Sequence, residues 1–407
     1  MSSIKNVFVN TKPSDKERKN FAILDVIRKY GPVAKSEISR LTGLNVVTIS
    51  NYMEGYVKNG LVAEEGYDAS SGGRKPMLVD LNYKSAYTIG LGFDMYDIIG
   101  VICDLKYNVV YKVKKERRSE STKGLIENLA SIVEDILRQS LVEKSKIKGI
   151  GLAVAGIIDR GNRTIRWPGP LGTQDVIISI SLWDEFAKQF ALPTVISNDA
   201  DCAAFAEQSI SLGPEYKDVL YMYSGVGCGI MINGQVYSGA SGCAGELGIL
   251  NPDAFGDYDW GQASRGLGRW SMDLGIIDEA KALREKRGES KIFASKQGTK
   301  GDIKFFSILE AARAKDKLAL ELLAAAGERL GKKVAFLVNL LNPQIVIIGG
   351  GVERAGPVLM DSLKKTVKGW ALEEVTRVLK IMPAQLAENA VPVGAAALVS
   401  KHYFEQL

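Results

Sequence analysis

Two short stretches combine acidic or amide side chains with small residues, and they are the strongest candidates for a ligand site. Residues 196–201 contain Asn198 and Asp199, at the point where an apolar strand should give way to a helix. Residues 242–248 form a turn of small residues that carries one carboxylate, Glu246. Carboxylate and amide oxygens accept hydrogen bonds from hydroxyl groups, so these side chains suit a polyhydroxylated ligand. A second interpretation is structural, with Asp199 as the N-cap of an ordinary strand-to-helix corner.

The elements that must position these residues form two similar halves. Residues 219–238 contain two apolar strands joined by a glycine-bearing bend, followed by a third strand, and residues 86–114 have the same layout. Two such halves predict an α/β fold with two lobes and a ligand cleft between them. We expect the first lobe to comprise residues 84–200 with 386–407. Residues 201–385 are expected to form the second lobe and to dimerise.

A separate domain is expected before residue 84. Apolar residues at helical spacing predict helices at 16–30, 35–42 and 46–58, and two strands at 61–65 and 77–80 flank a glycine-rich connection. Three helices of these lengths followed by a two-stranded wing predict a winged helix-turn-helix in residues 1–83. The other interpretation is a three-helix packing module with a loose loop.

This domain offers two groups of candidate DNA contacts. The outer face of the third helix carries short side chains that can reach base edges or phosphates: Asn45, Val46, Thr48 and Asn51. Asn45 can also cap that helix. The wing connection carries Arg74 and Lys75, and an arginine placed there can enter a narrow minor groove.

Composition excludes several other classes of protein. The 407 residues carry a formal net charge of only +5, so no strongly basic surface indicates nucleic acid binding by charge alone. The four cysteines lie in apolar or glycine-rich runs, and the one histidine is His402, so a zinc site is not expected. The first twenty residues lack the apolar core of a signal peptide, and no run is long enough to span a membrane. We expect a soluble, cytoplasmic protein without a metal or cofactor.

From about residue 17 onward, the chain resembles the ROK family of repressors, open reading frames and sugar kinases. It resembles in particular the regulator branch with an N-terminal winged helix, which includes xylose and N-acetylglucosamine repressors. The resemblance rests on six motifs in order: Gly-Arg-Lys-Pro at 73–76, Gly-Ile-Gly-Leu-Ala-Val-Ala-Gly at 149–156, Asn-Asp-Ala at 198–200, Ala-Gly-Glu-Leu-Gly at 244–248, Leu-Asn-Pro-Gln-Ile-Val-Ile-Ile-Gly-Gly-Gly at 341–351 and Val-Gly-Ala-Ala-Ala-Leu at 393–398.

The resemblance implies a bilobal, actin-like domain of the ribonuclease H-like, sugar-kinase type, assembled as a homodimer or a dimer of dimers. It assigns Asn198, Asp199 and Glu246 to the hydroxyls of a sugar, with Gly156 in the same ligand site. In kinase members, the residue matching Asp199 is the general base that deprotonates the attacking hydroxyl.

Three departures from the family pattern separate this chain from the kinases. Tyr96, Asp97 and Ile98 replace a Gly-Gly-Thr phosphate loop, and Tyr223 replaces a glycine in the second phosphate bend. Ile249 stands where the family has a zinc-ligating histidine, and no cysteine follows Cys243. A second carboxylate beside ATP phosphates is repulsive, and the replaced loop would no longer offer backbone N–H groups to them.

The sequence therefore predicts a sugar-responsive DNA-binding regulator and favours a repressor of carbohydrate-metabolism genes. Operator DNA and a sugar or sugar derivative are the expected partners. The competing interpretations are an ATP-dependent sugar kinase of the same family and a scaffold with a vestigial cleft.

Overall fold

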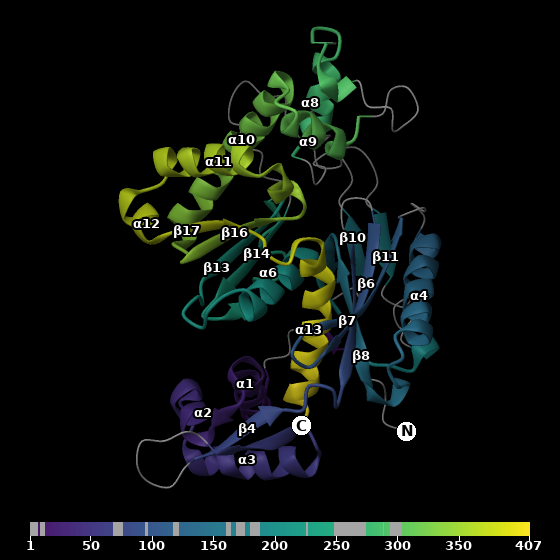
Figure 1. Ribbon diagram of the computed structural model, residues 1–407, viewed down its shortest axis with the longest axis vertical. Coiled ribbons are helices and arrows are strands. Elements are labelled where there is room, and N and C mark those ends of the chain that lie inside the picture. The colour runs from purple at the N-terminus through teal and green to yellow at the C-terminus, as the bar shows by residue number, and fades with distance from the viewer. Residues whose placement is uncertain are drawn as a thin grey trace. The chain divides into compact units, whose positions relative to one another are not determined.

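The computed structural model describes residues 7–8, 13–67, 76–93, 97–116, 122–159, 164–167, 176–179, 188–224, 227–247, 274–287, 289–293 and 303–407. The chain divides into two compact units (Figure 1). The first unit comprises residues 1–155, 179–202 and 391–407, and the second comprises 156–178 and 203–390. No helix among the described residues has the length and apolar character needed to cross a membrane.

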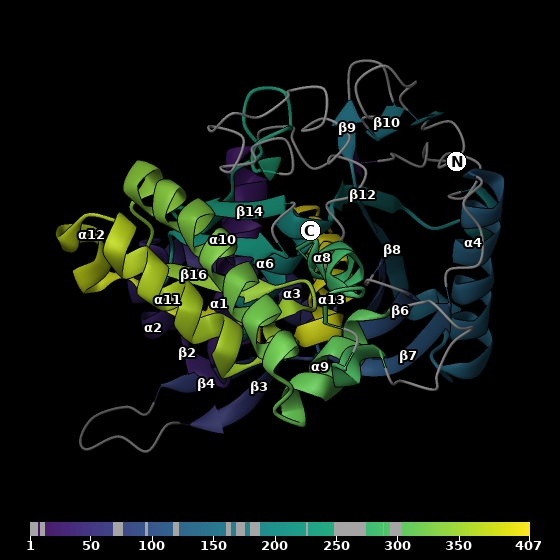
Figure 2. The same ribbon diagram turned by 90° about the horizontal axis from the view of Figure 1, so that it is seen from above.

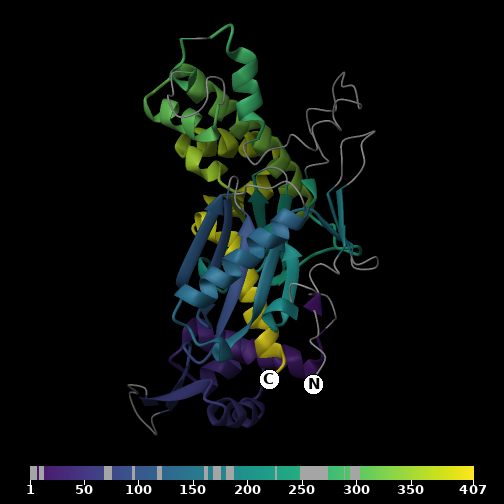
Figure 3. The same cartoon turned by 90° about the vertical axis from the view of Figure 1, so that its right-hand side faces the viewer.

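The first unit contains a six-stranded sheet with the order β1-β12-β8-β5-β6-β7. Its members are β1 (Val7–Phe8), β12 (Thr194–Asn198), β8 (Ile147–Val154), β5 (Tyr87–Phe93), β6 (Asp97–Asp104) and β7 (Val109–Glu116). The first four in this order run parallel, and β6 and β7 are antiparallel additions. Helix α4 (Thr122–Gln139) lies across this sheet (Figure 3), and the missing side chain of Gly100 on β6 lets Ile132 and Ile136 approach closely.

The sheet of the second unit repeats this layout. Its order is β15-β14-β13-β16-β17, with β15 (Gln235–Val236), β14 (Gly227–Ile232), β13 (Val219–Tyr223), β16 (Ile345–Gly349) and β17 (Lys380–Pro383). In each unit three antiparallel strands come first, and two parallel strands are then added beside the first of them. The predicted repeat between residues 86–114 and 219–238 is confirmed.

One predicted boundary is wrong. Residues 156–178 were expected in the first lobe, but the structure assigns them to the second unit. The reason is pairing: β9 (Ile157–Asp159), β10 (Thr164–Trp167) and β11 (Val176–Ser179) form a three-stranded sheet of their own. The continuous apolar run at 147–156 is therefore a strand only as far as Val154.

Two long helices of the second unit pack closely side by side (Figures 1 and 2). They are α10 (Lys317–Leu341) and α11 (Pro357–Trp370). A Cβ atom at Gly327 of α10 would lie 2.4 Å from the carbonyl oxygen of Leu359, so only glycine permits this approach. The Ser362 hydroxyl adds a 2.7 Å hydrogen bond to the carbonyl of Ala324. The remaining helices of this unit include α8 (Ile276–Leu283), α9 (Phe305–Arg313) and α12 (Glu373–Val378).

Residues 13–83 form an N-terminal module of three helices and a three-stranded sheet. The helices are α1 (Asp15–Tyr30), α2 (Lys35–Thr42) and α3 (Val46–Lys58), and the sheet has the order β2-β4-β3, with β2 (Val33–Ala34), β4 (Met77–Leu81) and β3 (Val62–Tyr67). The three predicted helices are confirmed to within one residue. Ser14 and Glu17 form a capping box at α1, since the side chain of each accepts a hydrogen bond from the backbone N–H of the other.

The N-terminal module shares its hydrophobic core with the rest of the first unit. Phe404 lies near the end of helix α13 (Ala390–Glu405) and is fully buried among side chains of the module. This shared core contains Ile23, Leu24, Ile27, Val33, Ile38, Ile49, Met53, Tyr56, Leu61, Val62, Val79, Leu81, Ala86, Leu105 and Phe404. These core residues come from both sides of residue 83 in the sequence. The predicted domain boundary at residue 83 therefore does not separate two hydrophobic cores.

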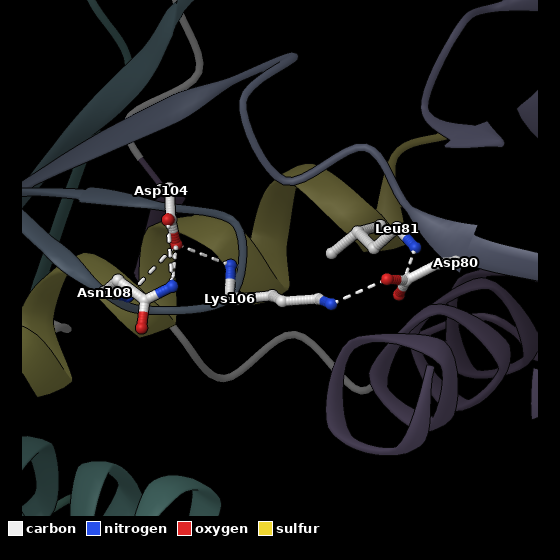
Figure 4. A network of polar contacts seen from close by, with 5 residues as sticks. All are labelled: Asp80, Leu81, Asp104, Lys106 and Asn108. Atoms are coloured by element: carbon white, nitrogen blue, oxygen red, sulfur yellow. Dashed lines mark hydrogen bonds and ion pairs between the residues drawn. The ribbon is translucent and has the colours of Figure 1, made fainter. Parts of the chain in front are cut away.

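Polar contacts also hold the N-terminal module against the rest of the first unit. Figure 4 shows Lys106, in the turn between β6 and β7, reaching Asp80 of β4, with 2.8 Å between Nζ and Oδ2. The backbone N–H of Lys106 donates to Asp104 Oδ1 at 2.9 Å, which fixes the turn that presents the lysine. The buried guanidinium of Arg28 lies 4.1 Å from the centre of the Tyr107 ring. The module and the first sheet therefore form one packed body.

Candidate functional site

Asn198 and Asp199 lie at the corner where β12 ends and helix α6 (Asp199–Ile210) begins. Asn198 Oδ1 accepts from the backbone N–H of Ala200 at 2.9 Å and of Asp201 at 3.3 Å. The helix cap is therefore Asn198, and the interpretation of Asp199 as the cap is wrong. Asp199 is buried, and its Oδ1 accepts from the N–H of Ala200 at 2.8 Å. Capping occupies the amide oxygen of Asn198 and leaves its Nδ2 group as the donor for a ligand.

This corner lies at the carboxyl edge of a parallel pair of strands. Asn198 is the register partner of Val154, the last residue of β8. Gly156 follows two residues later with a φ of 105°, in the left-handed region that favours glycine. Ligands of open α/β sheets bind outside the carboxyl ends of the strands, which is where Asn198 and Asp199 lie.

Glu246 is held by a loop that is fastened to β14. The backbone N–H of Cys228 donates to the carbonyl of Gly245 at 2.8 Å. Gly245 has a φ of 87°, and a Cβ atom there would lie 1.8 Å from the Cys228 carbonyl oxygen, so this position requires glycine. Burial raises the pKa of the half-buried Glu246 carboxyl. A carboxylate in such a position loses its charge at a higher pH than an exposed glutamate does.

The predicted ligand residues come from both units. Asn198 and Asp199 lie together in the first unit, whereas Gly156 and Glu246 belong to the second. Arg74, Lys75, Tyr96 and Ile249 lie outside the described residues.

The outer face of α3 presents most of the predicted DNA-contacting residues. Asn45 caps the helix as predicted, because its Oδ1 accepts from the N–H of Thr48 at 2.7 Å. Val46 and Asn51 are exposed, and Thr48 is half-buried. The most exposed apolar side chain here is Val47, at 71%, which the sequence prediction missed.

The helical spacing of apolar residues in α3 already indicates that Val47 is exposed. Ile49, Met53 and Tyr56 form the buried stripe of α3 at intervals of three and four residues. Val47 does not share that spacing, so an apolar residue there faces away from the core. A valine on this face can contact the methyl group of a thymine.

The residues that correspond to kinase phosphate loops make contacts within the protein. Ser224, at the bend after β13, donates from its hydroxyl to the Gly350 carbonyl at 2.9 Å and from its N–H to the Gly349 carbonyl at 2.8 Å. Both donors of Ser224 are thus used by the chain itself. Asp97 forms an ion pair with Lys114, 2.9 Å from Nζ to Oδ2. Its charge is partly neutralised, which reduces the phosphate repulsion expected from sequence.

The donor set for a family-type zinc ion does not fit this chain. Residues 248–273, outside the described part, contain neither histidine nor cysteine. Among the described residues, no group of three or more histidine, cysteine, aspartate or glutamate side chains could hold a metal. Cys103, Cys202 and Cys228 are buried, and burial raises the thiol pKa of Cys103 and Cys202, so these two thiols are inert.

The buried Glu207 and the half-buried Glu353 of the second unit predict a pH-dependent stability. Burial raises the pKa of Glu207 on α6, whose Oε1 accepts from the N–H of Leu386 at 2.8 Å. Burial also raises the pKa of Glu353, and the charge of Glu207 adds to that shift. A folded-state pKa above the unfolded value means that the folded chain binds the proton more tightly. The folded chain therefore gains stability as the pH falls from above the folded pKa to below the unfolded value.

Glu207→Gln removes this titrating charge and keeps an acceptor for Leu386. We expect the variant to melt about 2–4 °C above the parent at pH 8, the shift for about 1 kcal/mol in a domain of 150–250 residues. The difference should shrink as the pH falls and vanish below the unfolded pKa of glutamate. Calorimetry from pH 4 to 8 measures it, with the exposed Glu310→Gln as control. A pH-independent difference would contradict the assignment.

Comparisons with known proteins agree with this architecture. The sequence model of the ROK family matches residues 88–402. The chain is 24% identical over 387 residues to the xylose repressor of Bacillus subtilis, with 95% of each chain covered. Among solved structures, it is similar to a ROK family transcriptional regulator described as a homolog of the E. coli MLC protein, with a TM-score of 0.74, 20% identity and 96% and 97% coverage. It is also similar to a ROK family glucokinase from Streptomyces griseus solved with glucose and AMPPNP, with a TM-score of 0.65 and 24% identity, covering 77% of this chain and 99% of that one.

Proposed function

The chain belongs to the ROK family, and on that premise we propose that it is a sugar-responsive, DNA-binding transcriptional repressor of carbohydrate-metabolism genes. The N-terminal module acts as a winged helix-turn-helix on operator DNA in the cytoplasm. The chain binds a sugar or sugar derivative, and the protein acts as a homodimer.

The observation that carries the proposal is the outer face of α3. The helix buries Ile49, Met53 and Tyr56 and presents Asn51 and Val47 to solvent, one helical turn apart. A helix with an amide and an apolar side chain on one exposed face suits the major groove, where an asparagine can read adenine and a valine can contact thymine. The repressor and regulator relatives align over this module, whereas the glucokinase aligns with only 77% of the chain.

The proposed sugar binding rests on Asn198, Asp199 and Glu246. Asn198 offers a donor and the two carboxylates offer acceptors, which together match the hydroxyls of a sugar. Gly156 leaves room for close approach of the ligand to the backbone. A sugar can change operator affinity only if it binds one conformation of the chain more tightly than another.

An ATP-dependent sugar kinase is the competing function. Asp199 matches the kinase base, which favours catalysis, but the donors of Ser224 are bonded to Gly349 and Gly350. Tyr96 and Asp97 replace the other phosphate loop. We therefore propose that the chain is not an enzyme, and ATP turnover with a panel of sugars would overturn this.

The DNA-binding proposal is tested with Asn51→Ala. Operator sequences are first selected from random DNA with the parent protein. The variant is expected to lose discrimination at one base position by about 1–3 kcal/mol, because a bidentate amide contact to a base is removed. Asn59→Ala, at the far end of the same helix, is the matched control and should select the same sequences as the parent.

Arg74→Ala tests the wing separately. Loss of one phosphate-region cation should lower the log–log salt slope of operator binding by about one. If neither Asn51→Ala nor Arg74→Ala differs from the parent, the N-terminal module does not bind DNA through these residues.

A further inference from the structure

The exposed face of α3 continues beyond Asn51 into the second half of the helix. Four exposed side chains follow one another at intervals of four, three and four residues: Val47, Asn51, Glu54 and Lys58. Side chains at this spacing lie on one face of a helix, and here that face is opposite to the buried stripe. Glu54 therefore lies in line with the two side chains that we propose face the bases of DNA, Val47 and Asn51.

The Glu54 carboxylate differs from other exposed carboxylates of the N-terminal module. On α2, Glu37 Oε2 accepts from Arg40 Nε at 2.8 Å, a common arrangement for opposite charges three residues apart on a helix. Lys58 follows Glu54 by four residues, yet within the described parts of the chain no ion pair or hydrogen bond engages the Glu54 side chain. Its oxygens are therefore available to a donor from a binding partner.

A carboxylate on a DNA-facing surface is unfavourable unless the DNA supplies a hydrogen-bond donor to it. The phosphates repel its charge, and an ionised carboxylate only accepts hydrogen bonds. In the major groove, guanine and thymine present acceptors, and adenine places its N7 acceptor beside its amino group. Cytosine presents the N4 amino group, a donor, without an acceptor beside it. Glu54 is therefore matched to cytosine and to no other base.

Gly55, the next residue, indicates that a partner approaches this part of α3 closely. It is exposed and lies in the interior of the helix, where glycine is less favourable than alanine. A Cβ atom at Gly55 would meet no atom of the described chain within 4 Å, so no contact there requires the glycine. A helix surface without a side chain lets a second backbone come close. The sugar–phosphate backbone of DNA fits this gap.

We propose that Glu54 is a specificity-determining residue, which accepts a hydrogen bond from the N4 amino group of one operator cytosine, while Gly55 makes room for the DNA backbone. This inference rests on the proposed DNA-binding function. Three residues of helix rise about 4.5 Å, and base pairs stack about 3.4 Å apart. The cytosine therefore lies about one or two base pairs from the adenine that Asn51 reads. Because Glu54 is repelled by the acceptors of other bases, it also lowers the affinity for DNA without that cytosine.

Selection of operator sequences from random DNA by the full-length Glu54→Gln variant tests the cytosine contact. For the parent, replacing the selected cytosine should weaken binding about 5- to 150-fold, the effect of one good base contact. A glutamine side chain pairs with adenine, so the variant should select adenine at that position and keep the position read by Asn51. It should also bind random DNA more tightly, because a negative charge is removed. Glu310→Gln removes an exposed carboxylate of α9 and should select the parental sequences.

Gly55→Ala tests the close approach through two quantities that should change in opposite directions. Alanine favours the helix, so the melting temperature should rise by up to about 2–4 °C. The added methyl group should weaken operator binding at least about fivefold, the lower end for an extra methyl in a packed contact. Gly369→Ala, at an exposed and equally open glycine of α11, is the matched control and should leave operator affinity unchanged.

The outcomes separate this inference from the proposed function. A Glu54→Gln variant that selects the same bases as the parent would overturn the cytosine contact. Operator selection that still depends on Asn51 would then leave the proposed DNA-binding function standing. A Gly55→Ala variant that binds operator with parental affinity would overturn the close approach at this residue. A parent that selects no DNA sequence would overturn both the inference and the proposed function.

Discussion

Replacement of Phe404 by alanine is expected to lower the free energy of unfolding by about 3–5 kcal/mol, the range for a buried phenylalanine whose site cannot collapse. Its ring is fully buried in the shared core, among residues of the N-terminal module such as Ile23 and Met53. The cavity would therefore open against the N-terminal module, which we propose binds DNA. Operator binding should be lost at a lower temperature than in the parent.

The measurement combines denaturant unfolding with operator binding by the same preparation. Phe306→Ala removes the same ring from an exposed position on α9 and should change neither quantity by more than about 0.5 kcal/mol. Phe404→Leu is the milder variant, because it keeps much of the apolar volume and should bind operator at low temperature. If Phe404→Ala binds operator with parental affinity and stability, the module folds without α13 and the shared core is incidental.

The second large effect is loss of the sugar response in Asp199→Asn and Glu246→Ala. If a sugar prefers one conformation of the chain by even 2 kcal/mol, it changes operator affinity by about 30-fold. Asp199→Asn keeps the size of the side chain but replaces one acceptor by a donor. Glu246→Ala removes an acceptor from the loop that Gly245 fastens to β14. Each variant is expected to bind operator without sugar as the parent does and to show no change when sugar is added.

Operator affinity is measured with and without D-xylose, D-glucose and N-acetylglucosamine, each at millimolar concentration. Asp361→Asn, an exposed carboxylate on α11, is the control and should keep the full response. Variants that respond like the parent would mean that the sugar binds elsewhere and that Asn198 and Asp199 serve only the helix corner. If the parent responds to none of these three sugars but does respond to another, the effector is that other sugar and the proposed site still stands.

Local signals in the sequence were enough to predict much of the fold. The three N-terminal helices were predictable because their apolar residues follow helical spacing and because Asn45 and Gly43 mark the turn before α3. The duplicated strand pattern was predictable because both copies alternate apolar runs with glycine bends. The cap of α6 was assigned to the wrong residue because Asn198 and Asp199 are adjacent and either type can cap a helix.

Other features depend on long-range contacts that the sequence does not display. Helices α11 and α12 and strand β17 went unassigned, although Pro357 at the first turn of α11 is a start signal for a helix. The ion pair of Asp97 with Lys114 depends on the register of β6 and β7. The role of α13 was also missed, because nothing local in the sequence indicates that Phe404 completes a core near residue 23.

The packing of α13 against the N-terminal module has a consequence for how the protein is made. The side chain of Asn20 on α1 donates to the carbonyl of Glu405, 385 positions later in the chain. A ribosome that adds 5–20 residues per second needs on the order of 20–80 s to span that distance. The N-terminal module is thus synthesised first, but it is completed only when the end of α13 has been made. Protease resistance of the module in released chains, but not in ribosome-bound chains arrested before residue 390, would show this order directly. A growing chain would then be unable to occupy an operator before the parts that sense sugar have been synthesised.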